Sequence, residues 1–403
     1  MTTRSSSFAL VALTSLFFMW GLITSLNDIL IPHLKAVFEL TYLEAMLIQF
    51  CFFGAYFLMS FPSGYLVEKA GYRRGIVTGL SIAALGCLGF YPAWALHSYP
   101  VFLSALFVLA SGITLLQVAA NPYVTVLGDP QTAASRLNLT QAFNSLGTTI
   151  GPLVGAGLIL AAGASGSSAT QGPYVILAFA LAAIALVFSR LKLPAIRTGR
   201  PPGDDLCAAI PVRRVWRYRH LVLGAIAIFM YVGAEVTIGS FLVNFLSQSD
   251  IAGLSESAAG RYVSIYWGGA MLGRFIGVAI LRRVRPASLL AFNACCAILL
   301  LILAMTAKGS TAMVAVLAIG LFNSIMFPTI FTLGIANLGR HTGEGSGVLC
   351  MAIVGGAVVP VVAGHVADVS TISWAFAVPA LCYAYIFFYG VRGYWERLDR
   401  ARV

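Results

Sequence analysis

Two carboxylates lie inside apolar runs of the sequence, where a charged side chain is costly. Of the 14 acidic residues, Asp28 and Glu235 fall well inside such runs, and nearly all the others lie in polar segments or near the ends of runs. A carboxylate at the centre of a membrane costs about 2.5 to 3.5 kcal/mol on insertion scales. Desolvation favours the protonated form of a carboxyl group, so either residue could take up and release a proton near neutral pH without a metal. The alternative is a neutral acid that serves packing through a hydrogen bond to a neighbouring helix.

Amide and hydroxyl side chains recur at helical spacing around these carboxylates. They form two sets that follow each other along the chain: Gln117, Asn121 and Thr125, then Asn138, Gln141, Ser145 and Thr148 with Asn144 adjacent. Helical stripes of this kind face a cavity or another helix rather than lipid. Hydrogen bonds between helices would explain either stripe alone. Two stripes with a carboxylate in one half of the chain, and Glu235 and Asn323 at matching places in the other half, favour a polar central cavity.

The polar groups of such a cavity suit a neutral polyol. Asn and Gln each offer a donor and an acceptor, as a sugar hydroxyl does, and a carboxylate can accept from two hydroxyls. The apolar face of a pyranose could stack on an aromatic side chain, with plain packing as the alternative for each candidate: Trp20, Tyr56, Tyr231 and Trp267. No Lys or Arg is expected in mid-membrane, because Arg274 is placed near a helix end. A phosphate or carboxylate substrate would therefore lack its usual counter-charge.

The composition indicates that membrane-spanning helices position these residues. The 403 residues are 59% hydrophobic and only 10% charged, with a mean hydropathy of +0.89, whereas soluble domains are about one quarter charged. The apolar residues form about twelve blocks, each long enough to cross a hydrocarbon core of about 30 Å. Helices are expected at about 8–31, 42–66, 75–97, 100–127, 134–162, 173–192, 219–247, 255–281, 287–307, 311–338, 345–368 and 371–395.

The basic residues report the orientation of these helices. Twenty-one of the 25 Lys and Arg residues fall on one side of the membrane when the N-terminus is placed in the cytoplasm. This bias follows the positive-inside rule, so the net charge of +11 does not indicate a nucleic-acid partner. We expect a multi-pass protein of a bacterial-type cytoplasmic (inner) membrane with both termini in the cytoplasm.

An internal repeat divides the chain into two halves. Several positions recur at an offset of 206 to 208 residues: Gln117 with Asn323, Pro122 with Pro328, Gly128 with Gly334, Asp28 with Glu235, and Pro152 with Pro360. The one long polar connection, 193–218, separates six helices from six. The pattern predicts an all-α membrane protein with twelve transmembrane helices in two pseudo-symmetric six-helix bundles, 1–192 and 219–403, with the substrate site between them.

The connection between the second and third helices carries a recognisable motif. It reads GYLVEKAGYRRG from Gly64 to Gly75 and resembles the conserved inner loop of the major facilitator superfamily, with Glu68 in place of the usual Asp. The resemblance implies that the loop joins the two halves, with the acid facing the start of the eleventh helix, whose dipole favours a negative charge. The expected conformational gate consists of Gly64, Glu68, Gly71, Arg73 and Arg74, with Glu344 as a partner of an arginine. A solvated turn is the alternative.

Longer motifs resemble the fucose/galactose/glucose:proton symporter family within that superfamily. They are LNDILIPH (26–33), AANPYVTVLG (119–128), RLNLTQAFNS (136–145) and NSIMFP (323–328). The resemblance implies the major facilitator fold, a protonatable Asp28 in the cavity, and sugar contacts from Gln141 and Asn144. L-fucose members carry Glu where Gln117 stands and Asn where Ser25 stands, whereas LQVAAN (116–121) and YVGAE (231–235) resemble the glucose/galactose members.

We therefore expect secondary active, proton-coupled uptake of a neutral hexose by alternating access, with glucose or galactose favoured over L-fucose. Asp28 and Glu235 are the expected proton-coupling residues. The expected substrate contacts are Asn27, Gln117, Asn121, Gln141, Asn144, Glu235, Asn323 and Trp267. Sodium coupling through Asp28 and nearby oxygen atoms stays open. A proton-coupled exporter of drugs or metabolites also stays open.

An enzyme is not expected. The five His are scattered toward helix ends, and the seven Cys lie mostly inside apolar spans without metal-ligand spacing. We expect no metal and no cofactor beyond the coupling ion, no nucleic acid, and a monomer whose partners are a hexose and the lipid bilayer.

Overall fold

The chain is helical throughout its described residues. The computed structural model describes residues 3–37, 42–96, 98–161, 168–191 and 212–394, and the backbone alone at 3–7, 26–37, 42–46, 94, 152–161, 168–171, 173, 212–214, 256–257 and 340. No strand occurs in these ranges. Among the described residues, ten helical segments are long and apolar enough to cross a membrane. The expected all-α membrane fold is confirmed.

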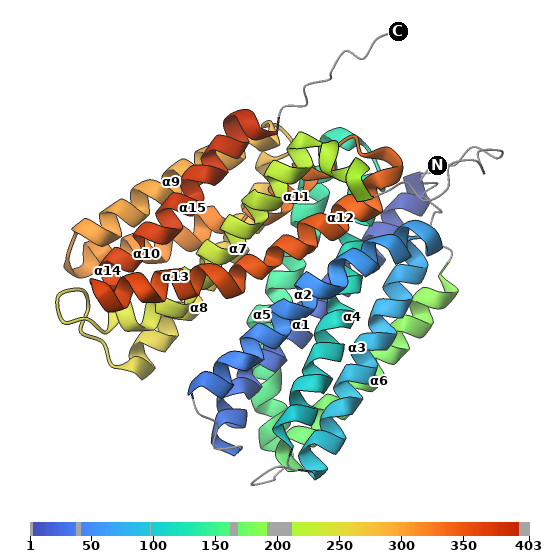
Figure 1. Ribbon diagram of the computed structural model, residues 1–403, viewed down its shortest axis with the longest axis horizontal. Helices are drawn as coiled ribbons and strands as arrows, with labels where there is room; N and C mark the ends of the chain where they lie inside the picture. The colour runs from blue at the N-terminus through green and yellow to red at the C-terminus, as the bar shows by residue number, and fades with distance from the viewer. Residues whose placement is uncertain (1–2, 38–41, 97, 162–167, 192–211, 395–403) are drawn as a thin grey trace. The chain divides into compact units, whose positions relative to one another are not determined.

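The first of two compact units spans Met1–Ile196. It contains six long helices, blue to green in Figure 1: α1 (Thr3–Val37), α2 (Tyr42–Ala70), α3 (Tyr72–Ala95), α4 (Tyr99–Val126), α5 (Ala133–Ala161) and α6 (Ser168–Arg190). α3 packs along α4 and α6, α1 packs along α5, and α2 packs along α4. α4 is buried without interruption from Leu109 to Thr125, so its polar side chains lie inside the unit. Most of the predicted linker, 192–211, lies outside the described residues.

Glycines let α3 and α4 approach closely. A Cβ added at Gly112 would collide with the backbone nitrogen of Ala83, and one added at Gly86 would collide with the backbone of Leu109. Small residues at helix contacts are the usual basis of helix association in membranes, because they let backbones approach. The α3/α4 contact therefore depends on the absence of a side chain at these positions.

The Gly112→Ala variant is expected to lower the free energy of unfolding by about 1 to 3 kcal/mol, because the added methyl group overpacks this contact. The matched control is Gly54→Ala on α2, where no atom lies within 4 Å of an added Cβ. The control is expected to keep or slightly raise stability, since Ala favours helix over Gly. Thermal unfolding of the purified variants in mild detergent measures both. A Gly112→Ala protein as stable as the wild type would contradict the close packing.

The second unit spans Arg197–Val403. Its helices are α7 (Arg219–Leu246), α8 (Glu256–Ile280), α9 (Pro286–Thr306), α10 (Gly309–Asn323), α11 (Met326–Gly334), α12 (Thr342–Met351), α13 (Gly355–Val369), α14 (Ile372–Ala375) and α15 (Ala377–Phe388). α7 packs against α11, α13 and α15 (Figure 1). The sequence predicts single helices at 311–338, 345–368 and 371–395. This is wrong in detail, because the structure interrupts all three.

The break between α10 and α11 follows from a proline. In a continuous helix the carbonyl of Ser324 would accept from the nitrogen four residues later, which belongs to Pro328 and carries no hydrogen. The Nε of Arg274 on α8 donates to this carbonyl at 3.1 Å instead. A side chain thus satisfies the carbonyl that the proline leaves free.

The two preceding carbonyls at the break also accept from side chains. Asn293 Nδ2 on α9 donates to the carbonyl of Phe322 at 2.9 Å, and Tyr231 Oη on α7 donates to the carbonyl of Asn323 at 3.2 Å. Irregular backbone at membrane depth is tolerated where such partners are available. The break is therefore stabilised by one side chain each from α7, α8 and α9.

Candidate functional site

Asp28 and Asn27 lie in the described backbone of α1, but their side chains lie outside the described residues. Close to these two residues α1 is joined to α5, because Ser25 Oγ donates to the carbonyl of Thr148 on α5 at 2.9 Å. The expected roles of Asp28 in proton coupling and of Asn27 in substrate contact stay predictions.

In the first unit, two amides on α4 have buried atoms without a hydrogen-bond partner among the described residues. Asn121 is 0% exposed, and neither its Oδ1 nor its Nδ2 has a hydrogen-bond partner among the described residues. Gln117, one helical turn earlier, is 6% exposed, and its Oε1 is likewise unpartnered there. A buried polar group without a hydrogen bond costs about 1 to 3 kcal/mol. These amides can therefore gain stabilisation from a polar ligand or from water.

The two α5 amides expected to contact sugar are placed differently from each other. Gln141 is buried, with 6% of its surface exposed. Asn144 is half-buried, and its Nδ2 donates to the carbonyl of Phe17 on α1 at 2.9 Å. One end of the Asn144 amide thus joins α5 to α1, and a contact of this residue with sugar stays a prediction.

In the second unit, Glu235 belongs to a hydrogen-bonded network. Tyr231, one turn earlier on α7, donates from Oη to Oε1 of Glu235 at 2.7 Å. The same hydroxyl lies 3.2 Å from the carbonyl of Asn323, so its single hydrogen is shared between two acceptors and links the carboxylate to the break between α10 and α11. Glu235 is half-buried. The carboxylate is therefore oriented by a tyrosine that is itself completely enclosed.

Asn323 uses both ends of its amide inside this network. Its Nδ2 donates to Tyr266 Oη at 2.7 Å, and its Oδ1 accepts from Tyr383 Oη at 2.6 Å. The side chain is 1% exposed. Trp267, next to Tyr266, is 40% exposed and meets the Tyr266 ring edge-on at a centroid distance of 5.2 Å. Trp267 therefore offers an accessible aromatic face, whereas Asn323 is committed to neighbouring side chains.

Arg274 corrects the expectation of a cavity without cations. The sequence predicts this helix to within one residue of its observed end at Ile280, but Arg274, six residues before that end, lies inside a candidate membrane span rather than outside the membrane. Besides its bond to Ser324, its guanidinium lies within coulombic range of the Glu235 carboxyl group. The second unit thus carries both an acidic residue, Glu235, and a basic residue, Arg274, within its spans.

The expected gate residues can be described only within their own units. Gly71 has a φ of +86°, which favours glycine, and Gly64 is buried in α2. Arg73 Nε donates to the carbonyl of Phe188 near the end of α6 at 3.1 Å, while Arg74 is exposed and Glu68 half-buried. In the second unit, Glu344 Oε2 lies 3.5 Å from His341 Nδ1. The contacts expected between the loop and the eleventh span stay predictions.

Comparison with known proteins places this helical arrangement in a family. Residues 9–358 match the family model described as Major Facilitator Superfamily. The chain belongs to the major facilitator superfamily. It is a member of a family of membrane transporters rather than of enzymes, as the sequence predicts.

Individual relatives of this major facilitator match over nearly its full length. It is 58% identical to the glucose/galactose transporter of Brucella abortus, over 97% of this chain and 95% of the relative. It is 47% identical to the putative glucose/galactose transporter of Helicobacter pylori, over 98% of each. The crystal structure of the Escherichia coli fucose:proton symporter aligns with a TM-score of 0.87 at 35% identity, covering 96% of this chain and 98% of the other.

Several residues of the second-unit network of this major facilitator escape prediction from sequence. Arg274, Tyr266 and Tyr383 are not among the expected site residues. The signal for Arg274 is Pro328, since the proline frees a carbonyl that requires a donor from another helix. The two tyrosines carry no comparable signal, because a tyrosine in an apolar span is as easily explained by packing.

Proposed function

We propose that this major facilitator takes up a neutral hexose, glucose or galactose in the first instance, in symport with protons. The observation that carries the substrate class is the 58% identity to a protein named glucose/galactose transporter across 97% of the chain. The fucose:proton symporter among its structural relatives supports protons as the coupling ion.

The unpartnered amides of the first unit support a polyol as the ligand. A sugar hydroxyl donates one hydrogen bond and accepts others, so it complements an amide that offers both functions. Asn121 offers both ends of its amide and Gln117 offers its carbonyl oxygen. Gln141 is buried on the neighbouring helix α5. In our proposal these side chains and Asn144 contact the sugar, together with Asn27, Glu235 and Trp267. Asn323, expected from the sequence as a contact, supports the site through its bonds to Tyr266 and Tyr383.

Alternating access would couple sugar to protons as follows. With the site open to the outside, Asp28 binds a proton and the amides bind the hexose. A neutral carboxyl is less costly to enclose than a carboxylate, so protonation favours the change to the inward-open state. Loss of the proton inside then favours release. Gln117 cannot titrate, so the carboxyl groups available for this role are those of Asp28 and Glu235.

The protein is a multi-pass inner-membrane protein of bacterial type with a sugar as its substrate. We further propose that both termini lie in the cytoplasm, because that orientation places 21 of the 25 basic residues on the inner side. We also propose a monomer that needs no cofactor beyond the coupling ion.

Uptake of radiolabelled glucose into proteoliposomes tests this function. A pH one unit lower outside is worth about 1.36 kcal/mol per proton, so one-to-one coupling should accumulate sugar about tenfold. Unlabelled glucose and galactose are expected to compete, and L-fucose to compete less. The control is the same vesicles with an imposed sodium gradient and no pH difference. Accumulation driven by sodium alone would replace the proton with sodium, and transport of hydrophobic cations without sugar would indicate an exporter.

A further inference from the structure

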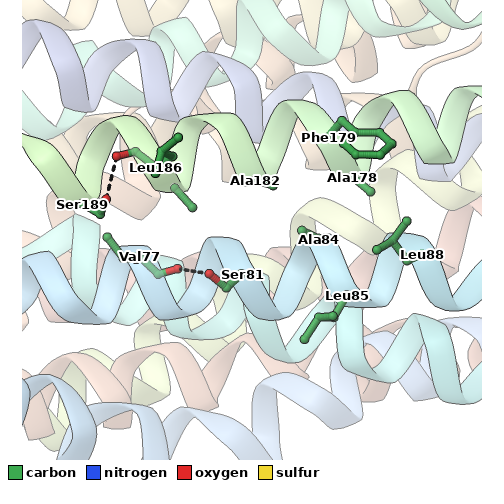
Figure 2. A pocket seen from close by; sticks show the side chains of 11 residues that line it. Val77, Ser81, Ala84, Leu85, Leu88, Ala178, Phe179, Ala182, Leu186 and Ser189 are labelled. Carbon is green, nitrogen blue, oxygen red and sulfur yellow. Dashed lines mark hydrogen bonds between the residues drawn. The ribbon is translucent and has the colours of Figure 1, made fainter.

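A groove with apolar walls runs along the first unit between α3 and α6. It has a volume of about 490 Å³, and Figure 2 shows the two helices with the facing side chains of its lining. Ala84, Ala178 and Ala185 form its buried floor, whereas Leu85 and Phe179 at its rim are 63% and 69% exposed. The polar stripes of this unit lie on α4 and α5. The groove is therefore separate from the amides of the proposed sugar site.

The two hydroxyls in the lining do not make the groove polar. Ser81 Oγ donates to the carbonyl of Val77 at 2.9 Å, and Ser189 Oγ donates to the carbonyl of Leu186 at 2.7 Å. These are bonds within their own helices, drawn as dashed lines in Figure 2. An occupant of the groove thus meets mostly hydrocarbon.

The length of the groove matches one leaflet of a bilayer. Its lining on α3 runs from Val77 to Leu88, which is about 16 Å at 1.5 Å per residue. Half of a hydrocarbon core of about 30 Å is about 15 Å. A single acyl chain extending from the membrane surface to the midplane fits this length.

Positive charge gathers at one end of the groove alone. The charged residues of α3 and α6 are Arg73 and Arg74, four and three residues before Val77, and Arg190, directly after Ser189. All three are exposed, and the bond from Arg73 Nε to the carbonyl of Phe188 ties the two helices together at this end. The positive-inside pattern assigns this end to the cytoplasmic surface.

We propose that this groove binds an anionic phospholipid of the inner leaflet. One acyl chain lies between α3 and α6, and the phosphate of the headgroup pairs with Arg190 and the neighbouring arginines. Guanidinium groups form strong, charge-assisted hydrogen bonds to phosphate. A zwitterionic lipid also carries a phosphate, but its ammonium group is repelled by the arginines, so the site selects a lipid with net negative charge. The site does not depend on the identity of the transported sugar.

Native mass spectrometry of the full chain with added lipid tests the proposal. The probes are dioleoylphosphatidylglycerol and, for comparison, dioleoylphosphatidylcholine. The wild type is expected to retain phosphatidylglycerol preferentially. Arg190→Gln should lower that retention about fivefold, the factor typical of one basic residue at an anionic surface. Arg283→Gln, an exposed inner-side arginine of the second unit, is the matched control and should retain the lipid.

A second pair of variants tests the groove itself. Ala182→Phe fills the lining, whereas Ala183→Phe places the same side chain on an exposed position of α6 outside it. Ala182→Phe should lose the retained lipid and Ala183→Phe should keep it. In the wild type, phosphatidylglycerol with a photoreactive acyl chain should crosslink to peptides covering 77–88 and 178–189. Equal retention of both lipids, equal loss in both Phe variants, or crosslinks confined to other helices would overturn the proposal.

Discussion

The Asp28→Asn variant is expected to lose uphill accumulation of sugar while it still exchanges sugar across the membrane. Asparagine keeps the size and much of the hydrogen bonding of the acid but cannot take up a proton. Under a pH difference of one unit, the internal sugar level should fall from about tenfold enrichment to equality with the outside. Net uptake of labelled glucose in proteoliposomes measures accumulation, and counterflow from sugar-loaded vesicles measures exchange.

Asp129→Asn provides the matched control for this substitution. Asp129 lies in the same unit, is exposed, and accepts from the backbone nitrogen of Gln131 at 2.9 Å at the start of a short 3₁₀ turn. The same chemical change at this surface position should leave accumulation close to the wild-type level. Proton-driven accumulation by Asp28→Asn at the wild-type level would remove Asp28 from the coupling mechanism.

Hydropathy was sufficient to predict the helices of this chain, because a membrane span needs about 20 apolar residues and leaves little room for alternatives. It was not sufficient to predict their interruptions. Pro122 and Pro328 occupy repeated positions, yet α4 continues through Pro122 whereas α10 and α11 are separated just before Pro328. At the break in the second unit, the carbonyls of Phe322, Asn323 and Ser324 accept from Asn293, Tyr231 and Arg274, which are distant in sequence.

The sequence predicts individual residues of the candidate site but not the contacts among them. Glu235 and Asn323 could be selected because polar side chains inside apolar spans are few. That Tyr231 bonds to both of them depends on how α7 lies against the break, which no local pattern specifies. The end of the helix that carries Arg274 is predicted at 281 and observed at Ile280. Arg274 nevertheless lies inside the span, where it bonds to Ser324, and no local pattern indicates that a cation is needed there.

The role of Glu235 can be separated from that of Asp28 by its own substitution. Glu235→Gln keeps an oxygen that can accept from Tyr231 but removes the charge and the titration. If Glu235 carries the proton, this variant should behave like Asp28→Asn in accumulation and counterflow. If Glu235 is instead a sugar ligand, the affinity for glucose should fall, and the remaining uptake should still be driven by the pH difference.

The Arg274→Met variant is expected to lose more stability and more uptake than a variant that lacks a surface arginine. The substitution removes the donor to the Ser324 carbonyl, which Pro328 cannot satisfy, and it leaves the Glu235 carboxylate without this neighbouring cation. An unsatisfied buried carbonyl costs about 1 to 3 kcal/mol, so the free energy of unfolding should fall by that amount. Proton-driven uptake should fall at least about tenfold, because the break carries both Asn323 and the Tyr231 link to Glu235. Thermal unfolding in detergent and uptake in proteoliposomes measure the two effects.

A double variant shows whether Arg274 acts through Glu235 or only through the break. Glu235→Gln combined with Arg274→Met removes the acid together with its cation, so the two losses of stability should be less than additive, by about 0.5 to 3 kcal/mol. The control is Arg261→Met, at an exposed arginine near the start of the same helix, which should leave stability and uptake close to wild type. Strictly additive losses would mean that Arg274 serves the Ser324 carbonyl alone. In that case the charge of Glu235 is balanced elsewhere, and Glu235 remains free to load and release a proton without Arg274.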